Sequence, residues 1–235
     1  VSEEHTVWGI LARDLIRETD RMNARTVGAE SGRQIPARRL PPSVSDTGLG
    51  DLRATDFINP TCWPTIDIVP SCANAAFVEF ASAQYRHLNP EWSFFAAVSR
   101  WLDTLPDDAY DMVIFDCPPA IGYQSMNAVF AADVLYIPSG PGYWEYDSTT
   151  SFIGQLAEAL SELSDFGADF PAGKSKLPKA FLDVRFLLTR YEPGNELHRA
   201  MRDAFGKVFG DRMAQHPIEH TRAVEQSGRF LSSVY

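Results

Sequence analysis

The chain has 235 residues, of which 45% are hydrophobic and 22% are charged, and its formal net charge is −10. This length suits one large α/β domain or two small ones, and the composition is ordinary for a soluble globular protein. The acidic balance argues against a broad basic face for nucleic acid, so contact with DNA would need a local basic patch or a second copy of the chain. No apolar run approaches the roughly 18 residues of a membrane span. Three scattered cysteines fit neither a disulfide framework nor a zinc site, which favours a reducing cytoplasm.

The N-terminal quarter divides into a helix and a long loop. Residues 2–18 carry apolar side chains near helical spacing, with Ser2 as a cap and Glu3 and Glu4 at the positive end of the helix dipole. Residues 22–64 contain five prolines and four glycines, which interrupt any long element. We therefore expect an extended or mobile loop there, with room for a short helical piece.

Beyond residue 64, short apolar strands alternate with longer helices. We expect strands at 65–70, 111–116, 133–139, 181–191 and 211–218, and helices at 71–85, 90–105, 123–131, 144–165, 195–210 and 219–227. This order predicts right-handed crossovers and an α/β fold: a three-layer, mostly parallel sheet with helices on both faces. No clear linker follows residue 65, so we expect one domain overall, in which residues 1–64 add a helix and a loop to a core at 65–235.

The stretch DMVIFDCPPAIG, residues 111–122, runs an apolar strand directly into an acid. In open parallel sheets ligands bind beyond the carboxyl ends of the strands, and a carboxylate placed there suits a Mg²⁺ held partly through water beside nucleotide phosphates. The alternative is that Asp116 only caps the turn or pairs with a lysine. Pro118 and Pro119 have fixed φ angles and donate no backbone hydrogen bond, so the strand must end there. Gly122 permits the close approach of another group or an unusual φ. A rigid turn after such an acid could sense a phosphate and pass the signal on.

Three blocks of the sequence resemble ParA-type partition ATPases. They are TIDIVPSCANAAFVEF, DMVIFDCPPAIGYQSMNAVFAADVLYIPSGPGYWEYDST and FLLTRYEPGNELHRAMRDAFGKVFGDRMAQHPIEHTRAVEQSG, and together they cover residues 65–230. The nearest resemblance is to the partition ATPases of large low-copy plasmids, sometimes called RepA. It implies a P-loop NTPase-like fold, ATP and Mg²⁺ as cofactors, a homodimer formed with ATP and nonspecific DNA binding by that dimer. It also implies a centromere-binding ParB-like partner and a cytoplasmic, nucleoid-associated location without a membrane.

The same resemblance assigns roles by position. Asp116 would be the catalytic Walker B acid, acting on Mg²⁺ through water, and residues 117–122 would form the switch segment after it. Residues 189–190 and 217–218 would lie near the adenine. The candidate nucleotide-binding residues are Asp116, Cys117, Pro118, Pro119, Gly122, Thr189, Arg190, Pro217 and Ile218.

The glycine-rich phosphate loop of that family has no counterpart in this sequence. The only candidate is GADFPAGKS, residues 167–175, in which Gly167 stands one place too early for G-x-x-x-x-G-K-[ST]. Leu177 and Pro178 follow where a phosphate-binding helix should begin, so we expect a solvated loop there. The fold should therefore be incomplete at its N-terminus, a fragment that lacks both ends and binds ATP poorly, and whether this chain is itself an enzyme stays open.

Two other functions stay open at this point. A division-site-selection ATPase would resemble the same block but would end in a basic amphipathic membrane helix. A non-catalytic interaction module would keep the ATPase fold without nucleotide chemistry. A phosphate loop encoded ahead of Val1 would favour the ATPase, and a true start at residue 1 would favour the module.

Smaller features carry two interpretations each. His216 and His220 could be a metal pair or ordinary turn residues. Cys117 could be reactive but fits a small buried filler better. Glu145, Asp147 and Ser148 fit a helix start, or else a dimer face. We expect these aromatic residues in the core: Trp92, Phe94, Phe95 and Trp101. Two basic groups could face DNA, although acids dilute the first: Arg185, Arg190, Arg199, Arg202, Lys207 and Arg212; and Arg33, Arg38, Arg39 and Arg53.

Overall fold

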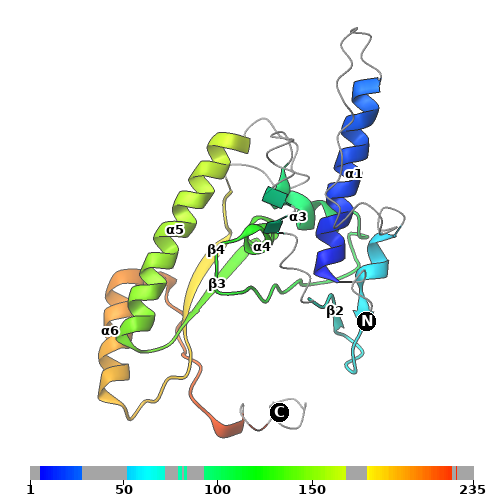
Figure 1. The fold of residues 1–235 in the computed structure, drawn as a ribbon. Coiled ribbons are helices and arrows are strands. Elements are labelled where there is room, and N and C mark those ends of the chain that lie inside the picture. Colours follow the sequence, from blue (N-terminus) through cyan, green and yellow to red (C-terminus); the bar gives the residue numbers. More distant parts are fainter. Residues whose placement is uncertain are drawn as a thin grey trace. The chain divides into compact units, whose positions relative to one another are not determined.

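The computed structural model describes residues 6–27, 52–71, 79–80, 82–83, 93–167, 179–223 and 226. The chain divides into two compact units, and each unit has its own buried side chains. Figure 1 labels helices and strands of both units. The first unit comprises residues 1–131 and 163–179, and the second comprises residues 132–162 and 180–235. None of the helices in the described part of the chain has the length and apolarity that a membrane crossing requires.

Helix α1 (Val7–Val27) opens the first unit and confirms the predicted N-terminal helix. Trp8, Leu11 and Leu15 are buried, as their helical spacing predicts. The predicted loop at 22–64 is wrong at its start, because the helix continues to Val27. No proline or glycine interrupts residues 10–27, so nothing stops the helix earlier. The predicted cap at Ser2 lies outside the described residues.

The short elements after the undescribed residues 28–51 are a 3₁₀ turn and a hairpin. The turn η3 (Ala54–Phe57) buries Phe57, and the strands β1 (Asn59–Pro60) and β2 (Asp67–Ile68) pair antiparallel, Asn59 opposite Ile68. The predicted strand at 65–70 is therefore correct in place but shorter. Its observed partner is antiparallel, because the chain turns back on itself within a few residues.

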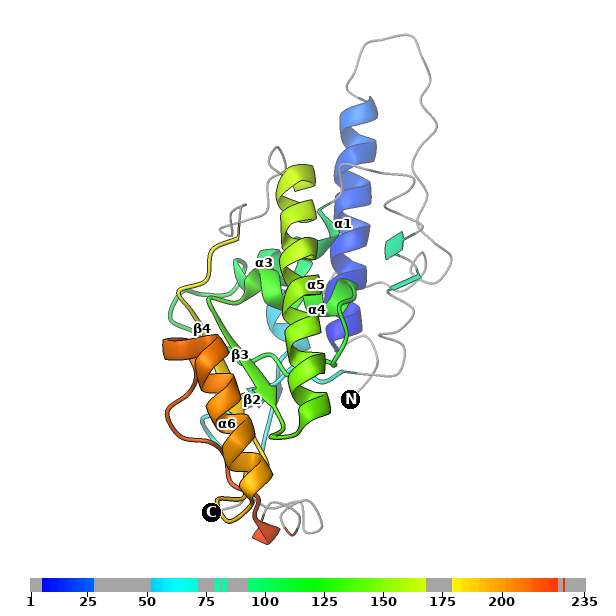
Figure 2. The same ribbon diagram turned by 90° about the vertical axis from the view of Figure 1, so that its left-hand side faces the viewer.

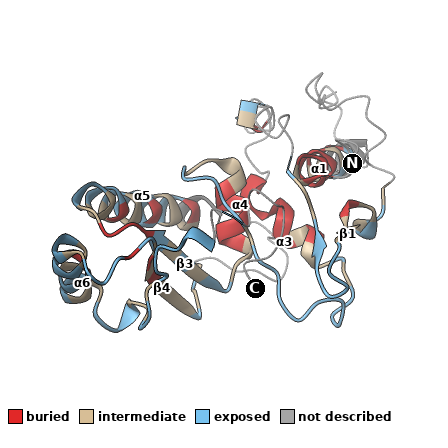
Figure 3. Cartoon of the chain, turned by 90° about the horizontal axis from the view of Figure 1, so that it is seen from below, coloured by how far each residue is buried: buried red, intermediate tan, exposed pale blue. Residues whose placement is uncertain are grey.

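The core of the first unit lies around η4 (Phe94–Ala96), α3 (Ala97–Leu102) and α4 (Tyr123–Ala131). Both helices are coloured largely as buried in Figure 3. The ring of Phe95 meets the edge of Phe130 at 4.8 Å, and Phe94 and Trp101 are buried as well. These contacts confirm the predicted aromatic core, apart from Trp92, which lies outside the described residues.

A fully buried amide holds these elements together. Oδ1 of Asn127 accepts the backbone N–H of Val98 at 3.2 Å, and its Nδ2 donates to the carbonyl oxygens of Phe94 and Tyr123 at 2.9 and 2.7 Å. A buried amide is stabilising only when its donors and acceptor are satisfied, as they are here. Asn127 therefore links α4 to the start of α3 by hydrogen bonds as well as by packing.

The predicted strand at 111–116 is wrong. This segment runs as an irregular, extended stretch, with no strand partner among the described residues (Figure 1). Met112 and Ile114 are 74% and 83% exposed. An apolar run favours an extended chain, but a strand also needs a neighbouring backbone with which to exchange hydrogen bonds, and none of the described residues provides one.

The second unit contains the parallel pair that the sequence predicts. Strand β3 (Val134–Ser139) pairs with β4 (Asp183–Leu188) over all six residues, from Val134 opposite Asp183 to Ser139 opposite Leu188. Helix α5 (Tyr143–Gly167) lies between them in the chain, as in a βαβ unit (Figure 2). The helix begins at Tyr143 and has Glu145 in its first turn, which confirms the prediction that Glu145, Asp147 and Ser148 lie at a helix start.

Helix α6 (Glu196–Phe209) covers β4 and has clear boundaries. Oδ1 of Asn195 accepts the N–H of Leu197 at 3.0 Å, and Gly210 ends the helix with a φ of 51°. The apolar face of α6 packs into a cluster that we call the β4–α6 cluster: Leu188, Tyr191, Met201 and Phe205, with Tyr146, Phe209 and Met213 at its edge.

The end of the second unit differs from the prediction. A 3₁₀ turn, η5 (Gly210–Arg212), replaces the start of the predicted strand at 211–218, and only isolated parallel bridges remain, Phe186 with Met213 and Tyr191 with Glu219. Residues 222, 223 and 226 are helical, within the predicted helix at 219–227. The α/β class is confirmed, and the single-domain interpretation stays a prediction.

Candidate functional site

Asp116 stands at the end of the extended segment with its carboxylate available. The residue is exposed and lines a cleft of the first unit. With the residues that the structure describes it makes neither a hydrogen bond nor an ion pair. The alternative interpretation, a carboxylate that caps the turn or pairs with a lysine, has no contact to support it in this part of the chain. A free carboxylate suits a cation bound partly through water.

The switch segment, residues 117–122, is a tight turn. The N–H of Ala120 donates to the carbonyl oxygen of Pro118 at 2.8 Å, across Pro119. Cys117 is exposed, so the prediction that it is a small buried residue is wrong. Partial loss of hydration, and then the neighbouring Asp116 carboxylate, still raise the pKa of the Cys117 thiol above its ordinary value. A raised pKa makes a reactive thiolate less available at neutral pH.

Gly122 joins the switch segment to α4 through a close contact. A β-carbon at Gly122 would lie only 3.0 Å from Oε1 of Glu79, so a larger residue would push that carboxylate away. The same carboxylate accepts the backbone N–H groups of Tyr123 and Gln124 at 2.9 and 3.0 Å. Glu79 therefore caps the positive end of α4, and the predicted close approach at Gly122 is confirmed.

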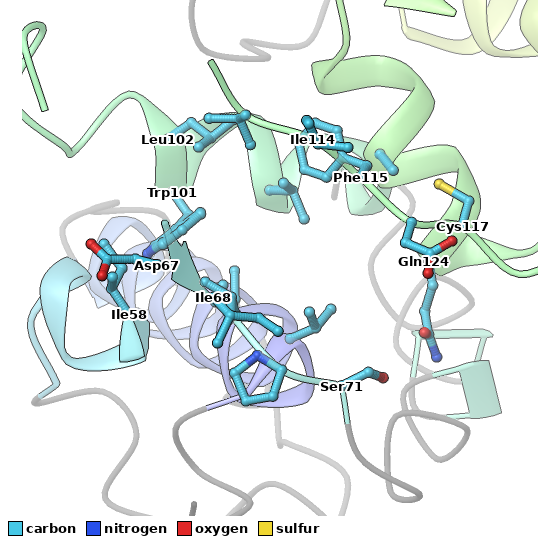
Figure 4. Close-up of a pocket in the computed structure, with 18 of the residues that line it drawn as sticks. Ile58, Asp67, Ile68, Ser71, Trp101, Leu102, Ile114, Phe115, Cys117 and Gln124 are labelled. Carbon is cyan, nitrogen blue, oxygen red and sulfur yellow. The ribbon is translucent and has the colours of Figure 1, made fainter. Parts of the chain in front are cut away.

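The cleft has a volume of about 480 Å³ and lies between two stretches of chain, residues 67–71 and 112–118. Helices form its floor, with Val98 and Trp101 from α3 and Ala128 from α4. Figure 4 shows Ile68 and Ser71 on one side of the opening and Phe115 and Cys117 on the other. We call this space the apolar cleft. Asp116 lies at its rim, near the end of the 112–118 wall.

A tyrosine joins the two walls at the other end. The phenol of Tyr110 donates to Oδ2 of Asp67 at 2.6 Å. This hydrogen bond to a carboxylate raises the pKa of Tyr110 above its ordinary value of 10.0. The bond holds the start of the extended segment against β2 and leaves the remainder of the segment open.

The four candidate residues of the second unit lie side by side. The N–H of Ile218 donates to the carbonyl oxygen of Leu188 at 2.8 Å, and the N–H of Tyr191 donates to the carbonyl oxygen of Ile218 at 3.1 Å. Thr189 and Arg190 lie between those two partners in the chain, and Pro217 precedes Ile218. Arg190 has a φ of 55°, a conformation that non-glycine residues rarely adopt. The structure thus brings Thr189, Arg190, Pro217 and Ile218 together at the end of β4.

Most arginines of the predicted basic stretch pair with acids. Arg190 contacts Glu145 at 3.4 Å, and Arg199 contacts Glu196 at 4.0 Å. Arg185 and Arg212 both contact Asp183, at 2.5 and 3.2 Å, and these contacts hold the pKa of Asp183 below its ordinary value, chiefly through the hydrogen bond from Arg185. Arg53 pairs with Asp56, whereas Arg33, Arg38 and Arg39 lie outside the described residues. Paired charges of this kind weaken the case for a DNA-facing patch.

Among the described residues, the structure offers a metal ion single carboxylates rather than a cluster of ligands. Within the described ranges, no three histidine, cysteine, aspartate or glutamate side chains gather in a way that could hold a metal. His220 lies 3.6 Å from Glu192, and the predicted pair with His216 gains no third ligand there. A Mg²⁺ bound through water beside phosphates needs only one protein carboxylate, and Asp116 fits that role. The phosphate-loop candidate at 167–175 lies almost wholly outside the described residues.

Sequence patterns did not reveal Glu79, Tyr110 or Asn127. Each acts through a partner far away in the chain, from 29 residues for Asn127 and Val98 to 44 for Glu79 and Tyr123. No local spacing encodes such contacts.

Comparisons with known proteins show the family to which the chain is related. A family model described as AAA domain matches residues 22–165 of the chain. Protein SopA of Escherichia coli strain K12 is 29% identical over 66% of this chain and 38% of SopA. The chain thus spans less than half the length of this curated relative, and the same holds for the replication proteins that it matches.

Two solved structures share the fold. One described as a partition protein has a TM-score of 0.61 at 20% identity, over 76% of this chain and 52% of that chain. Cobyrinic acid a,c-diamide synthase from Mycobacterium smegmatis, with bound ADP and magnesium, has a TM-score of 0.55 at 18% identity, over 97% and 91% of the two chains. These likenesses confirm the P-loop NTPase-like α/β fold class.

Proposed function

This chain belongs to the ParA-type partition ATPase family, matched here through an AAA domain, and we propose that residues 116–122 are the magnesium side of its nucleotide site. In this proposal Asp116 holds Mg²⁺ through water. The family relation carries the expectation of ATP and Mg²⁺, and one structural neighbour was solved with ADP and magnesium. The role of each residue is carried over by position from the family resemblance, and the geometry of the site supports it.

The observation that carries the proposal is the free carboxylate of Asp116, followed by a turn that is fastened to a helix. Asp116 has no partner among the described residues, so a cation can meet it without breaking a contact. From Asp116 the chain passes through Pro118 and Pro119 to Gly122, where Glu79 and the N-terminus of α4 meet. A change at Asp116 would therefore reach α4 through a short, stiff path.

In the second unit we propose an adenine contact at Thr189, Arg190, Pro217 and Ile218. The backbone hydrogen bonds between Leu188, Tyr191 and Ile218 hold these four residues together, and this placement supports the proposal. The strained φ of Arg190 also supports a functional role, because such strain concentrates at binding sites. Exposed Ile218 would offer an apolar surface to a base, and backbone groups nearby would offer hydrogen bonds.

In the reaction, Mg²⁺ would neutralise charge on the phosphates while water attacks the terminal phosphoryl group. The residues of this chain would hold the metal through Asp116 and transmit its presence through the switch segment. Phosphate binding itself needs a glycine-rich loop with a lysine, and these 235 residues contain no G-x-x-x-x-G-K-[ST] sequence. We therefore propose that these 235 residues contribute the metal, switch and adenine contacts, and we assign them no phosphate loop.

The partners proposed for the protein follow from its family. They are a second copy of the chain joined through ATP, nonspecific DNA bound by that dimer, and a centromere-binding ParB-like protein in a cytoplasmic, nucleoid-associated setting. The relatives' names support plasmid or chromosome partitioning. With many of its arginines paired, DNA binding would depend on the dimer more than on one face of a single chain.

The test is Mg²⁺-dependent ATP hydrolysis by the polypeptide as its gene encodes it. Asp116→Ala should lower the rate at least about 100-fold, because several kcal/mol of charge stabilisation depend on the metal. Asp108→Ala is the matched control, since Asp108 is an exposed acid near the same segment but outside the cleft, and it should hydrolyse ATP normally. Unchanged hydrolysis in Asp116→Ala would remove the metal assignment.

A further inference from the structure

The side chain of Arg190 reaches from the end of β4 to the first turn of α5. There its Nη2 donates to Oε1 of Glu145 at 3.4 Å, in a hydrogen bond that is also an ion pair. Both residues belong to the second unit, and their side chains are 67% and 41% exposed. Ion pairs this open to solvent add little to the stability of a fold. The importance of the contact therefore lies in what it does to Arg190.

Two glycines leave the space that the ion pair occupies. A β-carbon at Gly140 would lie 2.7 Å from Nη2 of Arg190 and 3.0 Å from Oε1 of Glu145. A β-carbon at Gly142 would collide with Oε2 of Glu145. Any larger residue at either position would displace one of the two charged groups. The turn from β3 to α5 thus carries no side chain where the guanidinium and the carboxylate meet.

Ser139, the last residue of β3, fixes the main chain on both sides of the ion pair. Its carbonyl oxygen accepts the N–H of Thr189 at 2.9 Å, and its Oγ donates to the carbonyl oxygen of Glu145 at 3.4 Å. The buried hydroxyl of Thr149 donates to the same Oγ at 2.8 Å. The main-chain segments that carry Arg190 and Glu145 are thus bonded to one buried residue, which brings their side chains together.

Arg190 is strained between two fixed neighbours. Its φ of 55° is costly for a residue with a β-carbon. Thr189 before it and Tyr191 after it both donate their backbone N–H groups within the second unit. Strain of this kind persists only where the surrounding contacts determine the conformation. Glu145 supplies the contact at the far end of the Arg190 side chain.

The φ of Arg190 sets the direction of the peptide group that joins it to Thr189. Among the described residues, nothing bonds to the carbonyl oxygen of Thr189 or to the N–H of Arg190. In an adenine contact, a carbonyl oxygen accepts from the exocyclic amine of the base, whereas guanine has an oxygen at that position and is disfavoured. The direction of this peptide group therefore bears on which base is bound.

We propose that Glu145 is a positioning residue for nucleotide selection: it holds Arg190 in its left-handed conformation and so directs the Thr189–Arg190 peptide group toward an adenine base. This inference rests on the proposed adenine contact and deepens it, because it names the residue that makes the contact selective for adenine over guanine. Glu145 itself needs no contact with the nucleotide. An ordinary surface ion pair, by contrast, would have no effect on the choice of nucleotide.

The test measures equilibrium binding of nucleotides to the polypeptide as its gene encodes it, by competition of ATP or GTP against a fluorescent ATP analogue with Mg²⁺ present. Glu145→Gln removes the charge and keeps the size of the side chain. It should weaken ATP binding about fivefold, which corresponds to about 1 kcal/mol, and leave GTP binding unchanged. Glu158→Gln, at an exposed acid farther along α5, is the matched control and should bind both nucleotides as the native protein does.

A second background shows whether Glu145 acts through Arg190. Arg190→Gly has no side chain to pair and adopts a positive φ without strain. In that background, Glu145→Gln should change neither affinity, because Glu145 no longer has a side chain to hold.

A measurement without nucleotide reports on the conformation itself. NMR relaxation should show a rigid amide at Arg190 in the native protein and in Glu158→Gln, and a more mobile one in Glu145→Gln. Thermal unfolding of Glu145→Gln should be nearly unchanged, because the ion pair is exposed.

A further variant separates this proposal from the adenine contact on which it rests. Ile218→Glu places a charge on the proposed base surface and should weaken ATP binding at least about tenfold. If it does so while Glu145→Gln keeps the native preference for ATP, the positioning role is wrong and the adenine contact stands. If neither variant affects ATP binding, the adenine contact is wrong and the positioning role falls with it. Equal losses from Glu145→Gln with and without the Arg190 side chain would also overturn the proposal.

Discussion

Two apolar runs of this chain look alike in sequence and differ in structure. VRFLL, residues 184–188, and MVIF, residues 112–115, both lead into polar residues at what should be the carboxyl end of a buried strand. The first belongs to β4, pairs with β3 along its whole length and carries the β4–α6 cluster. The second has no strand partner among the described residues and leaves Met112 and Ile114 exposed.

The difference shows that an apolar run specifies extension and burial but not a partner. Residues 183–188 pair in parallel with β3, a strand of the same unit that precedes them in a βαβ order. Residues 112–115 face a space of about 480 Å³ instead. The unpaired edge and Asp116, which has no partner among the described residues, thus occur in one place, and this geometry supports the proposed metal site.

The largest effect should come from the second unit, where the paired sheet depends on α6. Phe205 is 1% exposed at the centre of the β4–α6 cluster. Phe205→Ala should lower the free energy of unfolding by about 3–4 kcal/mol, because it removes a buried ring and leaves a cavity. Val208→Ala, at an exposed position of the same helix, should change it by less than about 0.5 kcal/mol. Urea unfolding followed by circular dichroism measures both, and similar losses would mean that the cluster does not support β4.

In the first unit stability should depend on a buried amide rather than on strand pairing. Asn127→Ala should cost about 2–3 kcal/mol, because Val98 N–H and the two carbonyl groups lose their partner inside the core. Gln124→Ala on the same helix should cost much less, since that side chain is only half-buried at the cleft. The same urea titration compares them. Equal costs for the two variants would contradict a special role for Asn127.

A smaller, pH-dependent effect should appear at the tie between the cleft walls. The bond from Tyr110 to Asp67 raises the pKa of the phenol, so its stabilisation is fully present below the ordinary value of 10.0 and is lost as the pH rises through the raised pKa. Tyr110→Phe should therefore be less stable than the native chain at pH 8, by about 0.5 kcal/mol for an exposed bond, and the difference should vanish in strong alkali. Thermal unfolding at pH 8 and in strong alkali measures this difference in stability between Tyr110→Phe and the native chain. A difference that is the same under both conditions would rule out the hydrogen bond as its cause.

Sequence reasoning succeeded where local chemistry decides. The apolar spacing of α5 and α6 is a local signal, and the predicted helices formed there. The β3–β4 pair followed from the order of elements. The place of Asp116, an acid directly after an apolar run, was also readable from the stretch 111–122, whereas its exposure was not.

It failed where a distant partner decides. The apolar pattern at 111–116 does not indicate whether another strand lies beside these residues. Composition averaged over residues 22–64 does not show that the N-terminal helix continues to Val27. The prediction that Cys117 is buried depended on the predicted strand at 111–116. Glu79, which caps α4 from far away in the chain, has no local signature at all.

Hydrogen exchange of the native chain compares the two runs most directly. We expect the amides of Val113, Ile114 and Phe115 to exchange nearly as fast as those of an unstructured peptide, because no described residue bonds to them. The amides of β4 that bond to β3 should exchange at least about 1,000-fold more slowly than an unstructured peptide. Protection at residues 113–115 equal to that of β4 would contradict the account, because the edge beside Asp116 would then already be occupied.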